Sequence, residues 1–367
     1  MAAVFSTALL DVYGNPSSTH RAGQLARQRL EEARRTLAET LRVSPAEMVI
    51  TSGGTESNNL AILGLLRNGS GKPLHAVTLA IEHPAVLEPF RQLEHEGVAV
   101  SYVKSVAAVA AALRDDTALV SIMHANNETG EIQPLAEVAT LIAERRANGQ
   151  NIYFHSDGVQ AFGKIPVDLA SLGVDLYSLS AHKIFGPKGI GALFVRKNTL
   201  LQRIQFGGRH ERERRPGTEN VPAAMAFAKA AELAVGSQRD TVAALRDQFE
   251  AQLLNCLPDI QVNAGWAARL PNTSNILFRG VSAEALVIAL DMRQMAVSTG
   301  AACSSGSLEP SHVLLAMGLT REEARSSIRF SFGRYNTPTE MAELVDAVVD
   351  SVNKLRQRAS KEARLAG

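Results

Sequence analysis

Between Ala46 and Arg196 short apolar runs alternate with amphipathic stretches, and this alternation constrains the fold more than any other feature of the chain. Several apolar runs have β-branched or other apolar residues at consecutive positions, as expected for strands covered on both faces. The runs predict strands at Met48–Thr51, Ala76–Ala80, Ala99–Val103, Ala118–Met123, Ile152–His155, Leu176–Leu179 and Ile190–Val195. Helical stretches separate many of them, and Pro134–Asn148 is the clearest of these. The pattern predicts an α/β fold with a mainly parallel seven-stranded sheet.

A different pattern follows Arg196. The stretch from Asn220 to about Cys256 is largely helical, and a closing helix is expected from Pro338 to Arg358. Further strands are predicted near Asn275–Phe278, Ala296–Ser298 and Ile328–Phe332. We therefore expect two domains: residues 1–236 form a large domain, and residues 237–367 form a smaller α+β domain.

The composition is that of an ordinary globular protein, with 46% hydrophobic and 20% charged residues. The net charge of +1 gives no reason to expect nucleic acid or an anionic membrane as a partner. The two cysteines, Cys256 and Cys303, fit neither a disulfide nor a zinc framework, which favours a reducing compartment. No apolar run reaches the length of a bilayer span, so we expect a soluble cytoplasmic protein.

Polar residues cluster where the predicted strands of the large domain end. In an open parallel sheet, ligands bind beyond the carboxyl ends of the strands. The clusters at these ends are Ser52–Asn59, Glu82-His83, His124–Gly130, Asp157–Gln160 and Ser180–Lys183. The sequence therefore predicts that five polar loops meet at one edge of the sheet.

The first of these loops has the residues of a phosphate-binding turn. Gly53 and Gly54 permit a close backbone approach, and Thr55 adds a hydroxyl at the expected start of a helix. By itself the segment favours the alternative, an ordinary glycine turn in which Thr55 caps the helix. It is not a nucleotide P-loop, because no Gly-Lys-Ser/Thr follows.

Lys183 ends a predicted strand, and a lysine in a pocket there can lose its charge and form a Schiff base. Lys188 is an alternative, although Pro187-Lys188-Gly189 has the composition of a turn. Asp157 ends another strand and offers a carboxylate to a pyridinium nitrogen, or else caps the following turn. His83 can stack on a flat ring or transfer protons, although a lone histidine is more often structural.

Cys303 lies among small residues in the segment Ser298–Ser307, where little bulk is available to bury a thiol. This favours an accessible, mobile cysteine, either as a nucleophile or as an inert loop thiol. Cys256 lies in an apolar helix end between Leu253 and Leu257, and we expect it to be a small core residue.

Taken together, seven segments resemble those of the cysteine desulfurases, the iron–sulfur-assembly branch of the class V aminotransferase-like enzymes that use pyridoxal 5′-phosphate (PLP). The resemblance spans nearly the whole chain, and the segments occur in the family's order and spacing. They are Gly14–His20, Thr51–Asn58, Glu82–Pro84, His124–Gly130, Ser180–Lys183, Arg215–Asn220 and Cys303–Pro310.

The resemblance implies the fold, the cofactor and a role for each site residue. The fold is that of aspartate aminotransferase (PLP fold type I), and the protein works as a homodimer. Lys183 holds PLP covalently, Asp157 pairs with its ring nitrogen, Gln160 bonds its phenolic oxygen, and His83 stacks on the ring and assists proton transfer. The remaining implied contacts are to the phosphate, from Gly54, Thr55, Ser180, His182 and a second subunit's Thr218, and to the substrate L-cysteine, from Asn15, Asn127 and Arg329.

The same resemblance makes Cys303 the acceptor that becomes a persulfide while the substrate leaves as alanine. The sulfur then passes to a scaffold or carrier protein. The family begins with a strand upstream of the segment that matches Gly14, and we expect this strand to be missing from the chain. Two alternatives remain at this point: a selenocysteine lyase or sulfinate-releasing relative, and a catalytically impaired scaffold that binds partners.

Overall fold

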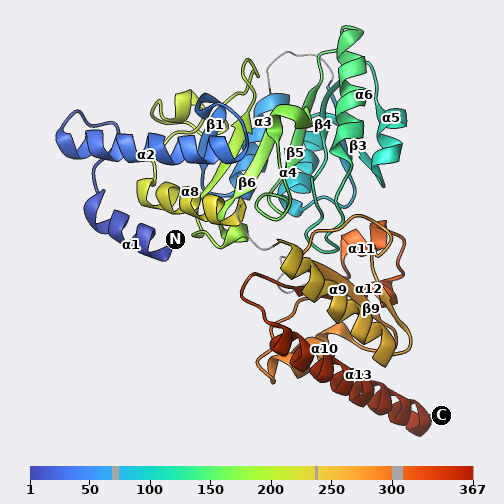
Figure 1. Cartoon of the computed structure of the whole chain (residues 1–367). Coiled ribbons are helices and arrows are strands. Elements are labelled where there is room, and N and C mark those ends of the chain that lie inside the picture. The colour runs from blue at the N-terminus through green and yellow to red at the C-terminus, as the bar shows by residue number, and fades with distance from the viewer. Residues whose placement is uncertain (68–73, 236–238, 300–308, 367) are drawn as a thin grey trace. The chain divides into compact units, whose positions relative to one another are not determined.

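The computed structural model of the chain describes residues 1–67, 74–235, 239–299 and 309–366 (Figure 1). The chain forms two compact units, of which unit 1 contains Met1–His124 and Gln133–Ser237, and unit 2 contains Ala125–Ile132 and Gln238–Gly367. Ala125–Ile132, which the sequence places in the large domain, groups with unit 2 because its backbone bonds there. Ile132 N donates to Ala268 O and Leu270 N donates to Gly130 O, both at 2.8 Å.

Unit 1 is built on a seven-stranded sheet in the order β1-β7-β6-β5-β4-β2-β3. The strands are β1 (Met48–Thr51), β2 (His75–Leu79), β3 (Ala99–Val103), β4 (Thr117–Ser121), β5 (Tyr153–Asp157), β6 (Leu176–Ser180) and β7 (Gly191–Val195). Only β7 runs antiparallel to its neighbours β1 and β6, so the other six strands share one direction. The predicted α/β fold with a mainly parallel sheet is confirmed.

The helices of unit 1 pack against the sheet and against one another. Helix α3 (Gly54–Leu66) packs against β1, β4, β5, β6 and β7 and against α4 (Pro84–His95). Helix α8 (Val221–Val235) contacts both α1 (Ala2–Asp11) and α2 (Arg21–Thr40), the yellow and blue helices of Figure 1. The other helical segments of unit 1 are η1 (Pro45–Glu47), η2 (Val106–Ala108), α5 (Val109–Ala112), α6 (Leu135–Ala147), α7 (Leu169–Leu172), η3 (Ala181–Ile184) and η4 (Glu211–Glu213). Among the described helices, none is long and apolar enough to span a membrane.

Unit 2 contains a three-stranded antiparallel sheet in the order β10-β9-β8. Its strands are β8 (Ile260–Val262), β9 (Thr273–Phe278) and β10 (Ser327–Ser331), and its helices are α9 (Arg239–Cys256), α10 (Ala283–Asp291), α11 (His312–Ala316), α12 (Arg321–Arg325) and α13 (Pro338–Ala366). The strand predicted at Ala296–Ser298 is wrong, because Ser298 pairs with Arg329 only through an isolated bridge. The opposite edge of the sheet is formed by β8, which the sequence analysis did not predict, because its three residues are too few for a recognisable pattern.

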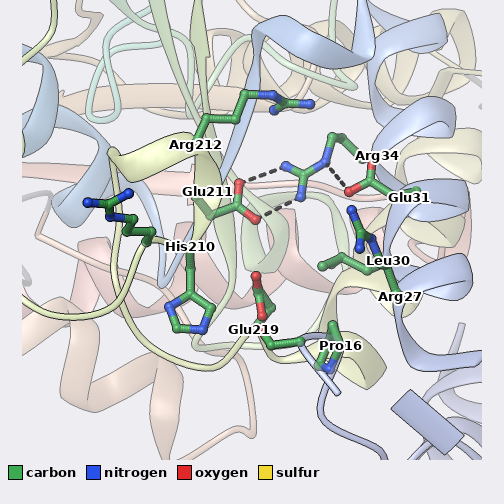
Figure 2. Close-up of a pocket in the computed structure, with 11 residues that line it drawn as sticks. Pro16, Arg27, Leu30, Glu31, Arg34, His210, Glu211, Arg212 and Glu219 are labelled. Carbon is green, nitrogen blue, oxygen red and sulfur yellow. Dashed lines mark hydrogen bonds and ion pairs between the residues drawn. The ribbon is translucent and has the colours of Figure 1, made fainter. Parts of the chain in front are cut away.

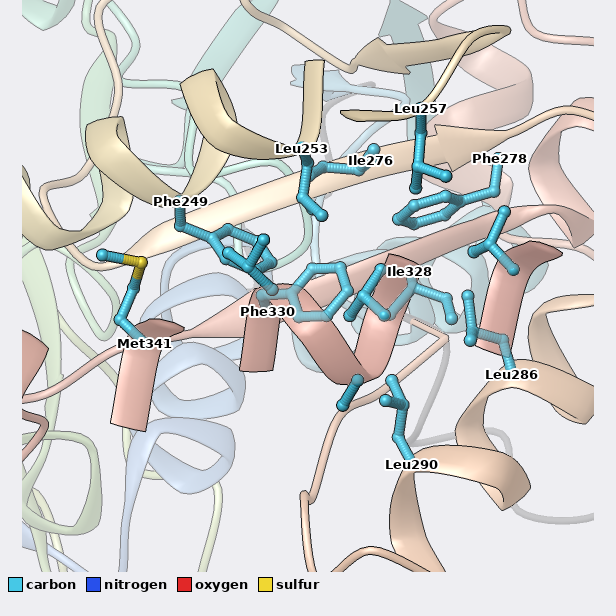
Figure 3. Close-up of a cluster of buried hydrophobic side chains, with 14 of the residues drawn as sticks. Phe249, Leu253, Leu257, Ile276, Phe278, Leu286, Leu290, Ile328, Phe330 and Met341 are labelled. Carbon is cyan, nitrogen blue, oxygen red and sulfur yellow. The ribbon is translucent and has the colours of Figure 1, made fainter. Parts of the chain in front are cut away.

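An apolar core holds the sheet of unit 2 against its helices (Figure 3). At its centre the ring of Phe330 lies 4.8 Å, centroid to centroid, from that of Phe249 and 6.2 Å from that of Phe278. The three rings come from β10, α9 and β9 and are fully buried. Aromatic contacts of this kind therefore connect three elements that are far apart in sequence.

Replacing Phe330 by alanine should lower the stability of unit 2 by about 3–5 kcal/mol, because the cavity left among three elements cannot collapse. Native-state hydrogen exchange of the β9 and β10 amides measures this loss even where the two units open separately. Leu254→Ala is the matched control on α9. Leu254 is 50% exposed, so its replacement should change stability by about 0.5 kcal/mol or less. Equal protection of these amides in Phe330→Ala and the wild type would contradict the expectation.

Candidate active site

The strand directions bring the ends of five strands of unit 1 to a common edge of the sheet. Strands β1, β2, β4, β5 and β6 run the same way, so the residues that follow them leave from the same side. Among the candidate residues, Asp157 ends β5 and His83 directly precedes α4. Gly54 and Thr55 begin α3 after β1, and Lys183 lies in η3 after β6.

Asp157 is the last residue of β5 and is 7% exposed. Its Oδ1 accepts a 2.9 Å hydrogen bond from Val159 N, and its Oδ2 accepts a 2.6 Å bond from Asn58 Nδ2. Burial raises the pKa of Asp157, whereas the two donors and the nearby charges of His83 and Lys183 lower it. The carboxylate thus both caps the following turn and lies within the electrostatic reach of the candidate lysine and histidine.

Lys183 lies in η3, directly after β6, and is exposed. Its neighbour His182 shares a 2.8 Å hydrogen bond between Nδ1 and the Oγ of buried Ser180. Burial and the charges of Lys183, Lys188 and Lys164 lower the pKa of His182, so the imidazole is neutral at pH 7. The competing Lys188 lies in a turn between Pro187 and Gly189, as its sequence indicates.

The N-terminus of α3 faces this segment. Gly53 adopts φ 152° and ψ −176°, a conformation that is essentially restricted to glycine. A Cβ built on Gly53 would lie 3.9 Å from Ser180 Oγ, and one built on Gly54 would lie 2.6 Å from Val159 Cγ2. Among the described residues no side chain caps α3 at Gly53, so its first amides are available to an anion.

His83 caps α4, because its Nδ1 accepts a 3.0 Å bond from Ala85 N. His83 and Thr55 line the same surface cavity of about 540 Å³, together with Asn59, Leu63, Pro84, Ala85, Glu88, Pro89 and Gln92. Gln160 lies in the loop after Asp157, where its Oε1 accepts a 2.5 Å bond from Lys164 Nζ. Contacts, a shared cavity or the charge of Asp157 thus link six candidate residues: Thr55, His83, Asp157, Ser180, His182 and Lys183.

These residues fit PLP by their chemistry. The uncapped helix end with Ser180 suits a phosphate, the buried Asp157 suits a protonated ring nitrogen, and Lys183 supplies a primary amine. The α3 N-terminus, Ser180, Asp157 and Lys183 all belong to unit 1 and lie at one edge of its sheet.

Unit 2 contains two of the three candidate substrate residues, Asn127 and Arg329. Arg329 lies on β10 and its Nη1 donates a 2.8 Å hydrogen bond to the backbone oxygen of Asn127. The adjacent Glu128 accepts a 2.5 Å bond from Ser311 Oγ, and its backbone oxygen accepts one from Asn275 Nδ2 at 3.2 Å. The segment that includes Asn127 is therefore fixed next to Arg329. Cys303 lies outside the described residues.

A second cavity of unit 1, of about 490 Å³, lies beside the loops that contain Asn15 and Thr218 (Figure 2). At its wall the buried Arg34 and Glu211 form a bidentate ion pair with both distances at 2.7 Å. Glu211 Oε2 also accepts from Ile50 N at 2.8 Å, so the pair connects α2, β1 and η4. The further lining residues are Pro16, Ser17, Arg27, Leu30, Glu31, Arg209, His210, Arg212 and Glu219.

The ion pair restrains a strained segment. Glu211, Arg212 and Glu213 have φ values of 43°, 56° and 65°, and a left-handed conformation costs a non-glycine residue roughly 1–2 kcal/mol. The segment that leads to Thr218 therefore begins from a backbone that the Arg34–Glu211 contact holds in place.

Two findings differ from the sequence analysis. Cys256, expected in the core, is exposed, because the buried positions at the end of α9 are Leu253 and Leu257. Asn58 was given no role, yet it is 1% exposed and bonded to Asp157. Its spacing of three residues from Thr55 on one helix was the available signal.

Comparisons with known proteins identify the family of the chain. Residues 3–344 match the aminotransferase class-V family. Cysteine desulfurase IscS of Dictyoglomus turgidum is 42% identical over 358 residues, covering 95% of this chain and 90% of the relative. Cysteine desulfurase IscS of Pseudomonas aeruginosa is 44% identical over 358 residues, covering 94% and 87%. A solved structure of a NifS-like protein matches with a TM-score of 0.88 and 33% sequence identity, covering 96% of this chain and 94% of the other. The structure of SspA in complex with cysteine matches with a TM-score of 0.80 and 34% identity, covering 92% of this chain and 95% of the other.

The fold and the cofactor-binding chemistry define an enzyme of the class-V aminotransferase family, to which the chain belongs. Its cofactor is PLP. Within that family the chain is a member of the cysteine desulfurases, which confirms the resemblance drawn from the seven segments.

Lys183→Ala should abolish covalent PLP binding, because among the lysines that the structure describes only Lys183 follows a strand at this edge within the electrostatic reach of the Asp157 carboxylate. Borohydride treatment followed by mass spectrometry should fix the cofactor to the wild type and to the control Lys188→Ala, but not to Lys183→Ala. Cofactor fixed at the wild-type level in Lys183→Ala would assign the attachment to another lysine.

Proposed function

We propose that the chain removes sulfur from L-cysteine, releases L-alanine and accepts the sulfur as a persulfide on Cys303. The observation that supports this most directly is the grouping of Asp157, Lys183, Ser180 and the α3 N-terminus at one sheet edge of a cysteine desulfurase. Measuring sulfide and alanine together after incubation with cysteine and a reductant tests the overall reaction.

The residues of unit 1 bind and orient the cofactor. Lys183 holds it through Nζ, Asp157 accepts from its ring nitrogen, and Gln160 donates to its phenolic oxygen. His83 stacks on the ring and moves a proton at the substrate. The phosphate contacts come from Gly54, Thr55, Ser180 and His182. When bound, PLP supplies the electron sink for bonds at the substrate carbon atoms.

The residues of unit 2 hold the substrate and receive its sulfur. Arg329 binds the substrate carboxylate as a planar donor, and Asn127, fixed beside it, adds a hydrogen bond. Asn15 of unit 1 completes the substrate contacts. The two units are accordingly a PLP-binding domain and a domain that contributes the sulfur acceptor.

The Cys303 thiolate then attacks the sulfur of cysteine, and the bond between that sulfur and the β-carbon breaks. The electron pair stays with the carbon skeleton, which takes up protons and leaves as alanine. A reactive thiolate requires a reducing compartment, which supports a cytoplasmic location. A scaffold or carrier protein takes the sulfur in the next step.

Cys303→Ser should bind PLP and cysteine like the wild type but release no sulfide and form no protein persulfide. PLP binding requires a lysine, a carboxylate and a phosphate site, whereas sulfur removal by this route requires a thiol. Alkylation and peptide mass spectrometry locate the persulfide. Cys256→Ser is the matched control, and its exposed position predicts wild-type stability and activity. Sulfur on Cys256, or undiminished sulfide release from Cys303→Ser, would refute the assignment.

The working form is proposed to be a two-fold homodimer, the commonest closed symmetry, in which Thr218 completes the phosphate site of the partner subunit. Thr218 is exposed on the chain itself, at the end of the segment that the Arg34–Glu211 pair anchors. A residue so placed has its side chain available to a second copy of the chain.

Light scattering should give the mass of two 39.3 kDa chains. Lys183→Ala and Thr218→Val chains are mixed and refolded together. Half of the dimers should then contain one chain of each kind, and each such dimer has one complete site. About a quarter of all sites should therefore be complete. Refolding each variant alone is the control. No recovery on mixing, or a monomer fully loaded with PLP, would exclude the shared site.

A further inference from the structure

Asn58 makes a short, buried and directional contact with the carboxylate of Asp157. Its Nδ2 lies 2.6 Å from Asp157 Oδ2, and both side chains lie inside unit 1. Among the described residues the other amide atom, Oδ1, accepts no hydrogen bond. With the carboxylate ionised, turning the amide over would place two oxygens without a proton at 2.6 Å, so Asn58 is the donor and Asp157 the acceptor.

Asn58 lies on the same face of α3 as Thr55, one turn further along the helix. The helix is buried from Leu60 to Leu66 and packs against five strands of the sheet, so it cannot shift by itself. One rigid element therefore presents Thr55 at its N-terminus and Asn58 one turn later.

The titratable and charged groups that act on Asp157 are His83, Lys183, Glu82 and Tyr177. Glu82 is fully buried, and burial, together with the charge of Asp157, raises its pKa well above the usual range. Burial and the same charge raise the pKa of Tyr177. Tyr177 is therefore uncharged at neutral pH, and the pKa of Glu82 is shifted toward the protonated form, whereas two hydrogen-bond donors and the charges of His83 and Lys183 favour the ionised form of Asp157.

Hydrogen bonds hold Glu82 and Tyr177 in place near Asp157. Met123 N donates to Glu82 Oε1 at 2.6 Å, and His124 N donates to Asp157 O at 2.9 Å. Tyr177 Oη and His124 Nδ1 are 2.7 Å apart. Of the contacts to the Asp157 carboxylate, only the one from Asn58 comes from a side chain of α3.

We propose that Asn58 is a positioning residue for the cofactor: its amide holds the Asp157 carboxylate as an oriented, ionised acceptor, so that α3 controls both the phosphate end and the ring-nitrogen end of PLP. This inference rests on the proposed role of Asp157. Asn58 acts through Asp157 and touches neither substrate nor cofactor.

The test compares PLP binding to apoprotein in the wild type, Asn58→Leu, Asn58→Ser and Asp157→Ala. Asn58→Leu should weaken PLP binding about tenfold to a hundredfold, the size expected for one hydrogen bond to a charged group. It should also move the pH transition of the bound cofactor's absorption band upward by about one to two pH units, because a carboxylate without its donor is protonated more easily. The kcat should fall while KM for cysteine stays unchanged. Asn58→Ser retains a hydroxyl donor and should give intermediate values, which also covers the case that the leucine variant does not fold.

Leu60→Ala is the control for packing, since Leu60 is buried on the same helix without a polar contact. It should lower the melting temperature but leave PLP affinity and the pH transition unchanged. Wild-type affinity and pH transition in Asn58→Leu or Asn58→Ser, alongside weakened binding in Asp157→Ala, would overturn the role of Asn58 alone. Unchanged binding in Asp157→Ala would instead refute the proposed role of Asp157.

Discussion

The burial of α3 against the sheet is the constraint on which the proposed cofactor site depends. Nearly every side chain from Ser57 to Leu66 is buried, and the helix contacts five strands. A helix that is apolar on all sides is stable only inside a structure, so its position is determined by the strands around it. Its uncapped N-terminus and the donor Asn58 are then held at the edge where the parallel strands end.

At this edge the surroundings act differently on the carboxyl groups of Asp157 and Glu82. Asp157 receives two donors and lies near two basic side chains, whereas Glu82 is fully buried and is disfavoured as an anion by the charge of Asp157. The donors and positive charges around Asp157 lower its pKa against the effect of burial, whereas burial and the charge of Asp157 both raise the pKa of Glu82. The same burial keeps His124 neutral, with its pKa lowered to about 4, so that its ring can pair with Tyr177 without adding charge.

A second buried charge contact shapes the surface that leads to Thr218. The Arg34–Glu211 pair replaces water on both side chains with two hydrogen bonds to each other and further bonds to the backbone at Met48 and Ile50. Removing one partner from such a pair leaves an uncompensated buried charge, which is strongly destabilising. Three consecutive left-handed residues can persist there because this contact fixes the first of them.

The resemblance of seven sequence segments to the cysteine desulfurases indicated the cofactor, and it gave Asp157 and Lys183, both at strand ends, their expected roles. Apolar runs in the sequence by itself placed all seven strands of unit 1 to within about two residues at each end. Such patterns are local, so periodicity reveals them. Tertiary structure decided the exposure of Cys256, the grouping of Ala125–Ile132 with unit 2, and the pairing of β8. It also decided the contacts Asn58–Asp157 and Arg34–Glu211, whose partners are 99 and 177 positions apart. Contacts of that range depend on how strands are ordered in space, which no local pattern encodes.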